Sequence, residues 1–339
     1  MRALATAVGP FETRHLQFRS TELLTNLLLR TTLLGLRSRQ SDELRPPWPN
    51  LVITAGRRNE PVARWIKQRS GQTTKLVHIG RPWTNPSNFD LVITTPQYFV
   101  PMAANVLLLT LPLNGLTPAA LAAGAAAWRP TLQHLPRPWT AVLVGGDSGP
   151  YRFTPARASH FASLLRARFD HGSLLVSTSG RTPPASVAAL RAGLGRHPKH
   201  FYNWHEDRHL ANPYAAYLGL ADQFVVTAES ASMLAEACST GKHVSMFALA
   251  GPPSERFGNL YWKPLTFALA QHLAPKRFRR DVSQLHRGLL ASGQVDWLGT
   301  PNETPARLVT ETGAPAGWTR SADELALAAA RVQALLKQP

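Results

Sequence analysis

Two serines and a glutamate follow an apolar run in the second half of the chain. The run ends at Thr227, Ser230 and Ser232 stand where a helical pattern begins, and Glu236 follows one turn later. The first turn of a helix leaves backbone N–H groups unpaired, and these donors together with the helix dipole suit a phosphate. Serine hydroxyls add donors, and the Glu236 carboxylate could accept hydrogen bonds from ribose hydroxyls. These residues indicate a nucleotide site, although helix capping by Ser230 explains the same pattern and is the commoner role.

Two adjacent glycines, Gly145 and Gly146, follow another apolar run and precede a helical pattern. Glycine allows the backbone to approach a ligand closely. The segment matches neither the GxGxxG spacing of a dinucleotide fingerprint nor a P-loop, because no GK[ST] follows. A ligand loop and a flexible turn therefore explain these glycines about equally well.

Three arginines stand at the ends of predicted strands. Arg181 follows the run 173–178, where it could pair with a phosphate or face solvent. Arg57 and Arg58 follow the run 51–55, at the carboxyl end of a strand, which is where open α/β sheets bind ligands. We include all three among the candidate ligand-binding residues.

No catalytic constellation can be assembled from the sequence, and the catalytic residues stay unknown. No HExxH, CxxC or EF-hand pattern occurs, so we predict no metal site and no cofactor. His78 lies inside an apolar run, which is typical of a core histidine, and Cys238 lies within a helical pattern, which is typical of a packed thiol. A single cysteine forms no internal disulfide, which favours a reducing compartment, the cytoplasm.

The chain is strongly basic. It has 37 Lys and Arg against 20 Asp and Glu, a net charge of 37 − 20 = +17. A field of this sign attracts phosphates, nucleic acid or anionic lipid headgroups, but an arginine-rich solvated surface explains it equally well. The basic residues are scattered, so we do not expect a nucleic-acid partner. No stretch is apolar over the roughly 20 residues that a membrane crossing requires, and peripheral association with an anionic inner membrane stays open.

Short apolar runs alternate with helical patterns along the chain. Runs that are apolar on both faces, with helices between them, indicate parallel sheets covered on both sides. A length of 339 residues fits two domains better than one. We therefore predict an α/β protein with two Rossmann-like domains. The expected strands are 51–55, 75–79, 91–94, 105–111, 140–144, 173–178, 201–204, 223–227 and 243–247, and the expected helices are 61–69, 155–169, 184–194, 212–219, 230–240 and 322–336.

The prolines in segment 135–139 mark the expected domain boundary, because proline stiffens the chain and stops a helix. We assign 1–134 to the first domain, 139–320 to the second, and 321–339 to a final helix. The chain opens with a helical pattern at 1–5, and the alternating residues 11–18 predict a strand. The opening strand and glycine-rich turn of the first Rossmann-like domain are therefore expected to be missing.

Several segments in combination resemble the mitochondrial-fission family named after the plant elongated-mitochondria protein. They are 48–58, 61–66, 78–82, 89–98, 145–146, 181–183, 212–214 and 227–241, so the resemblance covers nearly the whole chain. It implies a GT-B glycosyltransferase-like fold, with an acceptor-side first domain and a donor-side second domain.

The segment 229–236 looks like the donor-binding strand–turn–helix of peptidoglycan-type sugar transferases, where a serine meets the diphosphate and a glutamate meets the ribose. Carried over here, this implies Ser230, Ser232 and Glu236, and it favours ligand binding over capping. The chain departs from the family pattern at Glu229, where aspartate is usual, and at Ala231 and His243.

Two functions follow from the resemblance. The first is a metal-independent, glycosyltransferase-like protein that binds a nucleoside-diphosphate sugar in the cleft between its domains. The second is a non-catalytic adaptor of the same fold that acts at a membrane surface or on a partner protein, because the plant branch of the family implies recruitment of a dynamin-like protein. The sequence does not decide between them.

Overall fold

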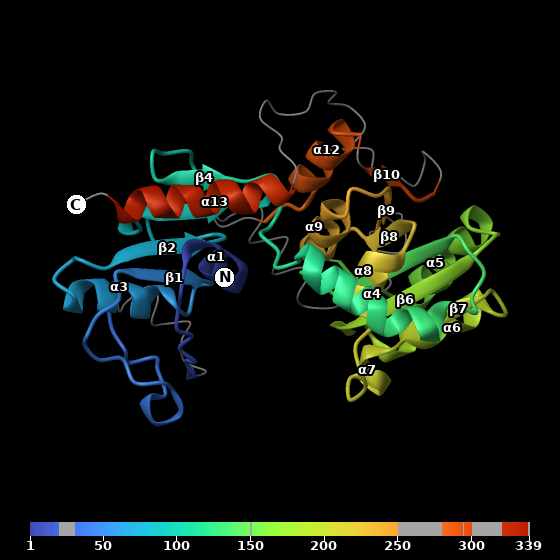
Figure 1. The fold of residues 1–339 in the computed structure, drawn as a ribbon, viewed down its shortest axis with the longest axis horizontal. Helices are drawn as coiled ribbons and strands as arrows, with labels where there is room; N and C mark the ends of the chain where they lie inside the picture. The colour runs from blue at the N-terminus through green and yellow to red at the C-terminus, as the bar shows by residue number, and fades with distance from the viewer. Residues whose placement is uncertain (20–30, 150, 250–279, 294, 300–320, 338–339) are drawn as a thin grey trace. The chain divides into compact units, whose positions relative to one another are not determined.

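The computed structural model of the chain describes residues 1–19, 31–149, 151–249, 280–293, 295–299 and 321–337 (Figure 1). These residues form two compact units. Unit 1 is built from Met1–Gly115 with the described parts of Ala274–Asp281 and Thr319–Pro339, and unit 2 from the described parts of Leu116–Leu273 and Val282–Trp318. Each unit holds one parallel sheet, which confirms the predicted α/β class with two sheets.

Unit 1 is built on a four-stranded sheet in the order β1-β2-β3-β4. The strands are β1 (Leu51–Ala55), β2 (Lys75–Ile79), β3 (Leu91–Thr94) and β4 (Val106–Leu108). All neighbouring strands run parallel. Their β-branched and aliphatic residues suit a sheet that is buried on both faces, and all four residues of β3 are buried.

Helices cover both faces of this sheet. On one face, α1 (Arg2–Val8) and α13 (Ser321–Leu336) pack against each other and share a core with Val77 of β2. On the other face, α3 (Glu60–Arg69) packs with Leu76. Successive strand residues point to opposite faces, which is why Leu76 and Val77 belong to different cores.

Unit 2 is built on a six-stranded parallel sheet in the order β10-β9-β8-β5-β6-β7. Its strands are β5 (Trp139–Gly146), β6 (Ser173–Arg181), β7 (Lys199–Tyr202), β8 (Gln223–Thr227), β9 (Val244–Phe247) and β10 (Val295–Trp297). Its helices are α4 (Pro118–Leu132), α5 (Pro155–Arg168), α6 (Pro184–Leu194), α7 (Trp204–Asp207), α8 (Tyr214–Leu220), α9 (Ala231–Ser239) and α12 (Ser283–Ala291).

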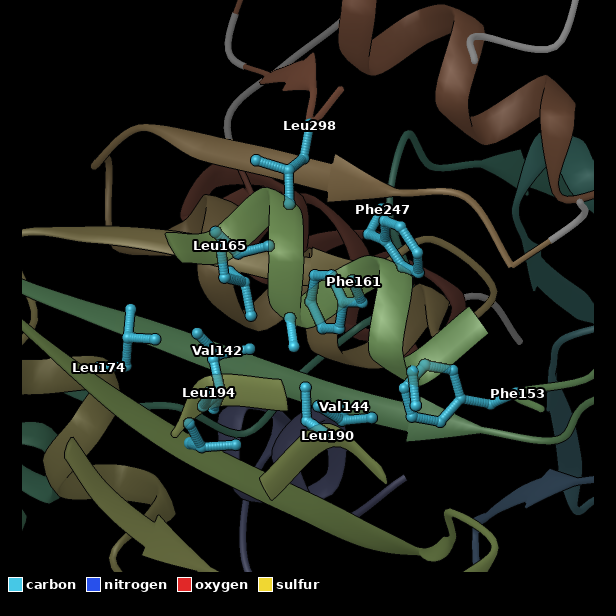
Figure 2. Close-up of a cluster of buried hydrophobic side chains, with 14 of the residues drawn as sticks. Val142, Val144, Phe153, Phe161, Leu165, Leu174, Leu190, Leu194, Phe247 and Leu298 are labelled. Carbon is cyan, nitrogen blue, oxygen red and sulfur yellow. The ribbon is translucent and has the colours of Figure 1, made fainter. Parts of the chain in front are cut away.

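A cluster of buried side chains joins this sheet to α5 and α6 (Figure 2). Phe161 and Leu165 of α5 and Leu190 of α6 pack with Val142 and Val144 of β5, and all five are fully buried. Burial of each large apolar side chain contributes about 1.5–3 kcal/mol relative to its exposure. The cluster therefore fixes β5, and with it the glycine turn that ends this strand.

The strand order of unit 2 reverses at β5. After β5 the chain adds β6 and β7 on one side, and it then returns to add β8 and β9 on the other side. Ligands of open α/β sheets bind outside the carboxyl ends of the strands at such a reversal. Here that position belongs to Gly145 and Gly146 at the end of β5 and to Glu229 and Ser230 just after β8.

The strand predicted at 11–18 is wrong. Among the described residues this segment makes only an isolated bridge, between Phe18 and Leu36. Its side chains are mostly exposed, and the backbone N–H groups of His15 and Gln17 donate to the side chains of Asp42 and Ser41. The alternating residues have the sequence pattern of a strand, but no neighbouring strand among the described residues pairs with them.

Helix α4 belongs to unit 2, so the compact units divide before the proline segment 135–139. It packs on α8, and Gly124 allows the two backbones to come close. A Cβ at this position would lie only 3.0 Å from the Ala216 N atom. Residues 116–134, which we assigned to the first domain, thus pack with the second unit. Among the α-helices and strands, α4, α7, α12 and β10 have no counterpart in the expected ones, whereas the other predicted strands and helices are found with ends shifted by a few residues.

Candidate functional site

Ser230 occupies the N-cap position of α9, but its hydroxyl makes no capping hydrogen bond. The backbone N–H of Ser230 donates to the Thr227 carbonyl, and its side chain accepts a hydrogen bond from Arg181 Nη2 at 3.4 Å. Ser230 is buried, whereas Ser232 in the first turn of the helix is exposed. Hydroxyl capping therefore does not account for Ser230, and its Oγ atom is turned toward an arginine.

Glu229 is the most buried charged group at this end of the sheet. Its side chain is 0% exposed, and its Oε1 atom accepts a hydrogen bond from Thr227 Oγ1 at 3.3 Å and lies 3.8 Å from Arg181 Nη2. The Oε2 atom is buried and has no hydrogen-bond partner among the described residues. Burial raises the pKa of Glu229 to about 7, while its own backbone N–H, Arg181, Thr227 and the Gly146 N–H act in the opposite direction.

The two glycines leave room that no other residue would leave. A Cβ on Gly145 would lie 2.1 Å from Oε1 of Glu229 and 2.8 Å from Cβ of Ser230. Gly146 has φ of +105°, and a Cβ there would lie 2.4 Å from the Arg181 carbonyl oxygen. The Gly145 N–H also donates to Thr227 Oγ1 at 2.8 Å. The glycine turn is thus required for the close approach of β5 to the loop that precedes α9.

Arg181 bridges the glycine turn and the start of α9. It is the last residue of β6, and its Nη1 atom donates to the Asp147 carbonyl at 3.3 Å while Nη2 reaches Ser230. Its side chain is 44% exposed. The guanidinium is therefore held in place by the protein and still open to solvent, as a group that meets an anionic ligand needs to be.

Glu236 lies further along α9 and is held by a tyrosine. The Tyr214 hydroxyl donates to Glu236 Oε2 at 2.5 Å. Burial raises the pKa of Glu236, and the hydrogen bond from Tyr214 lowers it. The hydrogen bond fixes one carboxylate oxygen of Glu236, so a ligand hydroxyl would meet an oriented acceptor.

Of the predicted site residues, the structure brings four together: Gly145, Gly146, Arg181 and Ser230. Ser232 and Glu236 lie on the same helix, whereas Arg57 and Arg58 belong to unit 1. Sequence reasoning missed three contributors, namely Thr227, Tyr214 and Glu229. Glu229 stood out only as a departure from the family pattern, and nothing in its local sequence indicates that it folds beneath the Gly145 turn.

In unit 1, His78 is confirmed as a core histidine. It is 0% exposed, and its Nε2 atom lies 3.9 Å from Oε1 of Glu60. Burial lowers the pKa of His78 to about 4, so the ring is neutral at physiological pH. Glu60 is also buried, and it accepts hydrogen bonds from the backbone N–H groups of Trp83 and Thr84.

The family model described as "Mitochondrial fission ELM1" matches residues 1–266, more than three quarters of the chain. This chain belongs to the mitochondrial fission ELM1 family. The resemblance of its sequence segments to that family is thereby confirmed.

Relatives of this ELM1-family chain come from plants and bacteria. The mitochondrial fission protein ELM1 of Arabidopsis thaliana is 30% identical over 219 residues, which cover 58% of this chain and 51% of the plant protein. The chain thus spans about half the length of that relative.

Solved structures similar to the ELM1-family chain include two bacterial sugar-metabolism proteins. The UDP-GlcNAc 2-epimerase of Neisseria meningitidis bound to UDP-GlcNAc has a TM-score of 0.40 and 11% identity, with 69% of this chain and 72% of that chain covered. A glycosyltransferase of Rickettsia africae has a TM-score of 0.39 and 10% identity, with 86% and 78% covered.

Among the described residues, no helix combines the length and the apolar character that crossing a membrane requires. Over the same ranges, no group of three or more His, Cys, Asp and Glu side chains is arranged to hold a metal ion. The predictions about location, membrane association and metal independence stay predictions.

Proposed function

We propose that unit 2 of this ELM1-family chain binds the diphosphate of a nucleoside-diphosphate sugar at the start of α9, as a glycosyltransferase-like protein. The observation that carries the proposal is the convergence of Gly145, Arg181 and Ser230 at the strand reversal beside β5. Gly145 lies at the end of β5, Arg181 ends β6, and Ser230 is the N-cap of α9, so three elements place a cation and a hydroxyl at the amino end of a helix.

The chemistry of this position suits an anion. The first turn of α9 presents backbone N–H donors and the positive end of the helix dipole. Arg181 adds a charge-assisted donor, and the Ser230 hydroxyl adds a neutral one. The glycines let the end of β5 approach Arg181 and the loop before α9 closely, and this approach sets the guanidinium beside the start of the helix.

The same groups would support sugar transfer. In such a reaction the bond between the sugar and the diphosphate breaks, and the negative charge that develops on the leaving diphosphate needs stabilisation. Donors that are already oriented by the protein stabilise that charge without rearranging during the reaction. Glu236, oriented by Tyr214, would accept hydrogen bonds from the ribose hydroxyls.

Isothermal titration of the full chain with uridine diphosphate, guanosine diphosphate and their sugar conjugates tests the proposal. We expect one site, and we expect Arg181→Gln to weaken binding by roughly 10- to 100-fold, since a hydrogen bond to a charged group is worth about 1.5–3 kcal/mol. Ser230→Ala and Glu236→Ala should weaken binding by smaller factors. Ser239→Ala is the matched control, because its hydroxyl donates only to the Glu236 carbonyl near the far end of the same helix.

Two results would defeat the proposal. One is the absence of binding by the wild-type chain to every compound of the panel. The other is equal binding by Arg181→Gln and Ser239→Ala, which would place the nucleotide elsewhere on the protein.

A second candidate function is a non-catalytic adaptor at an anionic membrane surface, which the net charge of +17 favours. Sedimentation with vesicles that contain anionic lipid should then capture the chain at low salt and release it at high salt. Capture that ignores both the lipid charge and the salt concentration would exclude this role.

A further inference from the structure

The carboxyl edge of the sheet in unit 1 carries a ladder of alternating arginines and aromatic rings. The Arg57 guanidinium lies 5.4 Å from the Trp83 ring centroid, and the Arg81 guanidinium lies 5.4 Å from Trp83 and 5.9 Å from the Tyr98 ring. These four residues come from the segments that follow β1, β2 and β3. Rings that flank a guanidinium attract it and limit its rotamers, so the cations are ordered before a ligand arrives.

A pocket of about 310 Å³ opens beside Arg81. Its lining is mainly apolar and comes from the loops after β2 and β3, including Pro82, Pro86, Val100 and Ala103. This volume lies at the small end of the range for ligand pockets, which typically combine apolar walls with a few polar groups that fix orientation. Arg81 adds a cation to this lining, which also includes the polar residues Thr84, Asn85, Ser87 and Asn105. A cation beside a mainly apolar surface suits a molecule with an anionic end and an apolar body.

The charges around Arg81 favour an anion of more than one oxygen. Burial lowers the pKa of Arg81, the neighbouring Arg280 cation lowers it further, and Tyr98 and Glu60 act in the opposite direction. Arg280 is positioned by Gln97, whose Oε1 atom accepts from Arg280 Nε at 3.3 Å. An anion placed beside Arg81 and Arg280 would offset the repulsion between these two cations.

We propose that this pocket binds a phosphate monoester with an apolar body, its phosphate at Arg81 and its apolar part against Pro82 and Val100. The site is separate from the nucleotide site in unit 2 and does not depend on it. Phosphate suits the ladder better than carboxylate, because three oxygens can meet guanidinium groups on more than one side. The source of the ester, a free metabolite or a lipid headgroup, is decided by the experiment.

The test uses the full chain and three probes, which are hexyl phosphate, inorganic phosphate and vesicles that contain phosphatidic acid. Titration calorimetry should show hexyl phosphate binding at least 10-fold more tightly than inorganic phosphate, because inorganic phosphate cannot fill the pocket. Arg81→Gln removes the cation, and Ala103→Trp fills the pocket from an exposed position. Each should weaken hexyl phosphate binding at least 10-fold and leave binding of uridine diphosphate in unit 2 unchanged.

Two matched variants control for the substitutions themselves. Arg69→Gln removes another arginine of unit 1 that stacks on a tryptophan, Trp65, at 5.5 Å. Ala104→Trp places the same large ring at the next exposed position, which does not line this pocket. Both should bind hexyl phosphate as the wild type does.

Several outcomes would overturn the proposal. They are no binding of hexyl phosphate by the wild type up to millimolar concentration, equal binding of hexyl and inorganic phosphate, and equal loss in the test and control variants. The vesicles decide the source of the ester once hexyl phosphate is shown to bind. If vesicles with phosphatidic acid capture the wild type but not Arg81→Gln, the ester is a lipid headgroup. If they do not capture the wild type, the ester is a soluble molecule. Failure of uridine diphosphate to bind while hexyl phosphate binds would refute the proposed function of unit 2 alone.

Discussion

The two sheets differ in how charged groups are packed at their carboxyl edges. In unit 2 the carboxyl ends of β5 and β8 enclose a buried carboxylate, Glu229, among glycines and the start of a helix. In unit 1 the corresponding ends carry arginines ordered by aromatic rings beside an open pocket. The same strand–loop–helix architecture therefore supports a close-packed site in one unit and a cationic pocket in the other.

Burial has opposite consequences for a base of unit 1 and an acid of unit 2 that lie near the carboxyl edges of their sheets. Burial disfavours the charged form, so it lowers the pKa of the His78 base to about 4 and raises the pKa of the Glu229 acid to about 7. At neutral pH His78 is neutral, whereas Glu229 is close to its midpoint. Glu229 is therefore a buried group of unit 2 that responds to pH changes near neutrality. In unit 1, burial also raises the pKa of the Glu60 carboxyl beside His78.

The largest effect should come from filling the glycine turn of unit 2. Gly146→Ala places a Cβ 2.4 Å from the Arg181 carbonyl at a φ of +105°, which L-residues rarely adopt. Overpacking against backbone and the strain of a positive φ together should lower the free energy of unfolding by about 2–5 kcal/mol. Urea unfolding followed by circular dichroism measures it.

Gly115→Ala is the control for that substitution, because its Cβ would meet nothing closer than 3.7 Å. It should change stability by less than about 0.5 kcal/mol. Equal stability of the two variants would mean that β5 and β6 do not approach each other as the structure has them.

The next effect concerns pH and Glu229. Glu229 has a pKa of about 7 in the folded chain against an ordinary value of 4.5, so the folded state binds more protons than the unfolded state between these values. The contribution of Glu229 to the free energy of unfolding should therefore fall as the pH rises from about 4.5 to 7, by an amount on the order of 3 kcal/mol. His78 acts in the opposite direction over much of this range, so the difference between the wild type and Glu229→Gln isolates the contribution of Glu229.

Glu229→Gln should remove that slope and leave the variant more stable than the wild type at pH 8. The comparison of unfolding at pH 5 and pH 8 tests this, with Glu206→Gln as the control, since Glu206 is exposed and pairs with Arg191. A wild type whose stability rises over this range, in parallel with the Glu229→Gln variant, would contradict the burial of the carboxylate.

The sequence predicted the strands far better than the contacts between them. The apolar runs of β2, β3 and β8 are short, bounded by turn residues and buried on both faces, so their residues alone identify them. The position of Ser230 at a helix start could be predicted from the same local pattern. Glu229 could not, because its burial depends on Gly145, which lies more than 80 residues earlier in the chain.

The segment 11–18 shows the opposite failure. Its alternation satisfied the local pattern of a strand, yet its backbone groups bond to the loop around Ser41 and Asp42. Likewise, the Arg57–Trp83–Arg81–Tyr98 ladder joins residues of three loops, and only the parallel order of β1, β2 and β3 brings them together. The local sequence pattern identified the helices and strands, whereas the tertiary arrangement of the strands determined which side chains lie close together.

In unit 1, His78 should give the opposite slope to Glu229. Its pKa of about 4 lies below the ordinary value of 6.5, so the unfolded chain binds more protons between these values. The contribution of His78 to stability should rise with pH over this window and be lost as the pH falls through it, by an amount on the order of 3 kcal/mol.

His78→Phe should flatten that dependence, because phenylalanine cannot bind a proton and can still pack on Phe89, whose ring centroid lies 4.9 Å from that of His78. Acid unfolding of the two proteins between pH 4 and 7 is the measurement. His15→Gln, which alters an exposed histidine of the same unit, should retain the wild-type profile. Identical acid unfolding profiles of the wild type and His78→Phe would show that His78 is not the group that makes the stability of unit 1 depend on pH.

The smallest effect should separate stability from binding within unit 2. Tyr214→Phe removes the hydroxyl that holds Glu236, and Tyr217→Phe removes a hydroxyl of the same helix that bonds instead to His200 Nδ1 at 2.5 Å. Each loss of a buried hydrogen bond should lower the free energy of unfolding by about 1 kcal/mol. The two variants are thus matched in chemistry, helix and expected cost.

Their nucleotide binding should differ. Tyr214→Phe frees the Glu236 carboxylate to rotate and removes the hydrogen bond that lowers its pKa, so the acceptor for ribose becomes less oriented and less often ionised. We expect binding of uridine diphosphate to weaken severalfold in Tyr214→Phe and to remain unchanged in Tyr217→Phe. Calorimetry with uridine diphosphate measures the affinity of both variants. Equal affinities would mean that Glu236 does not contact the ribose. The proposed diphosphate contacts of Arg181 and Ser230 are tested separately by the variants at those two residues.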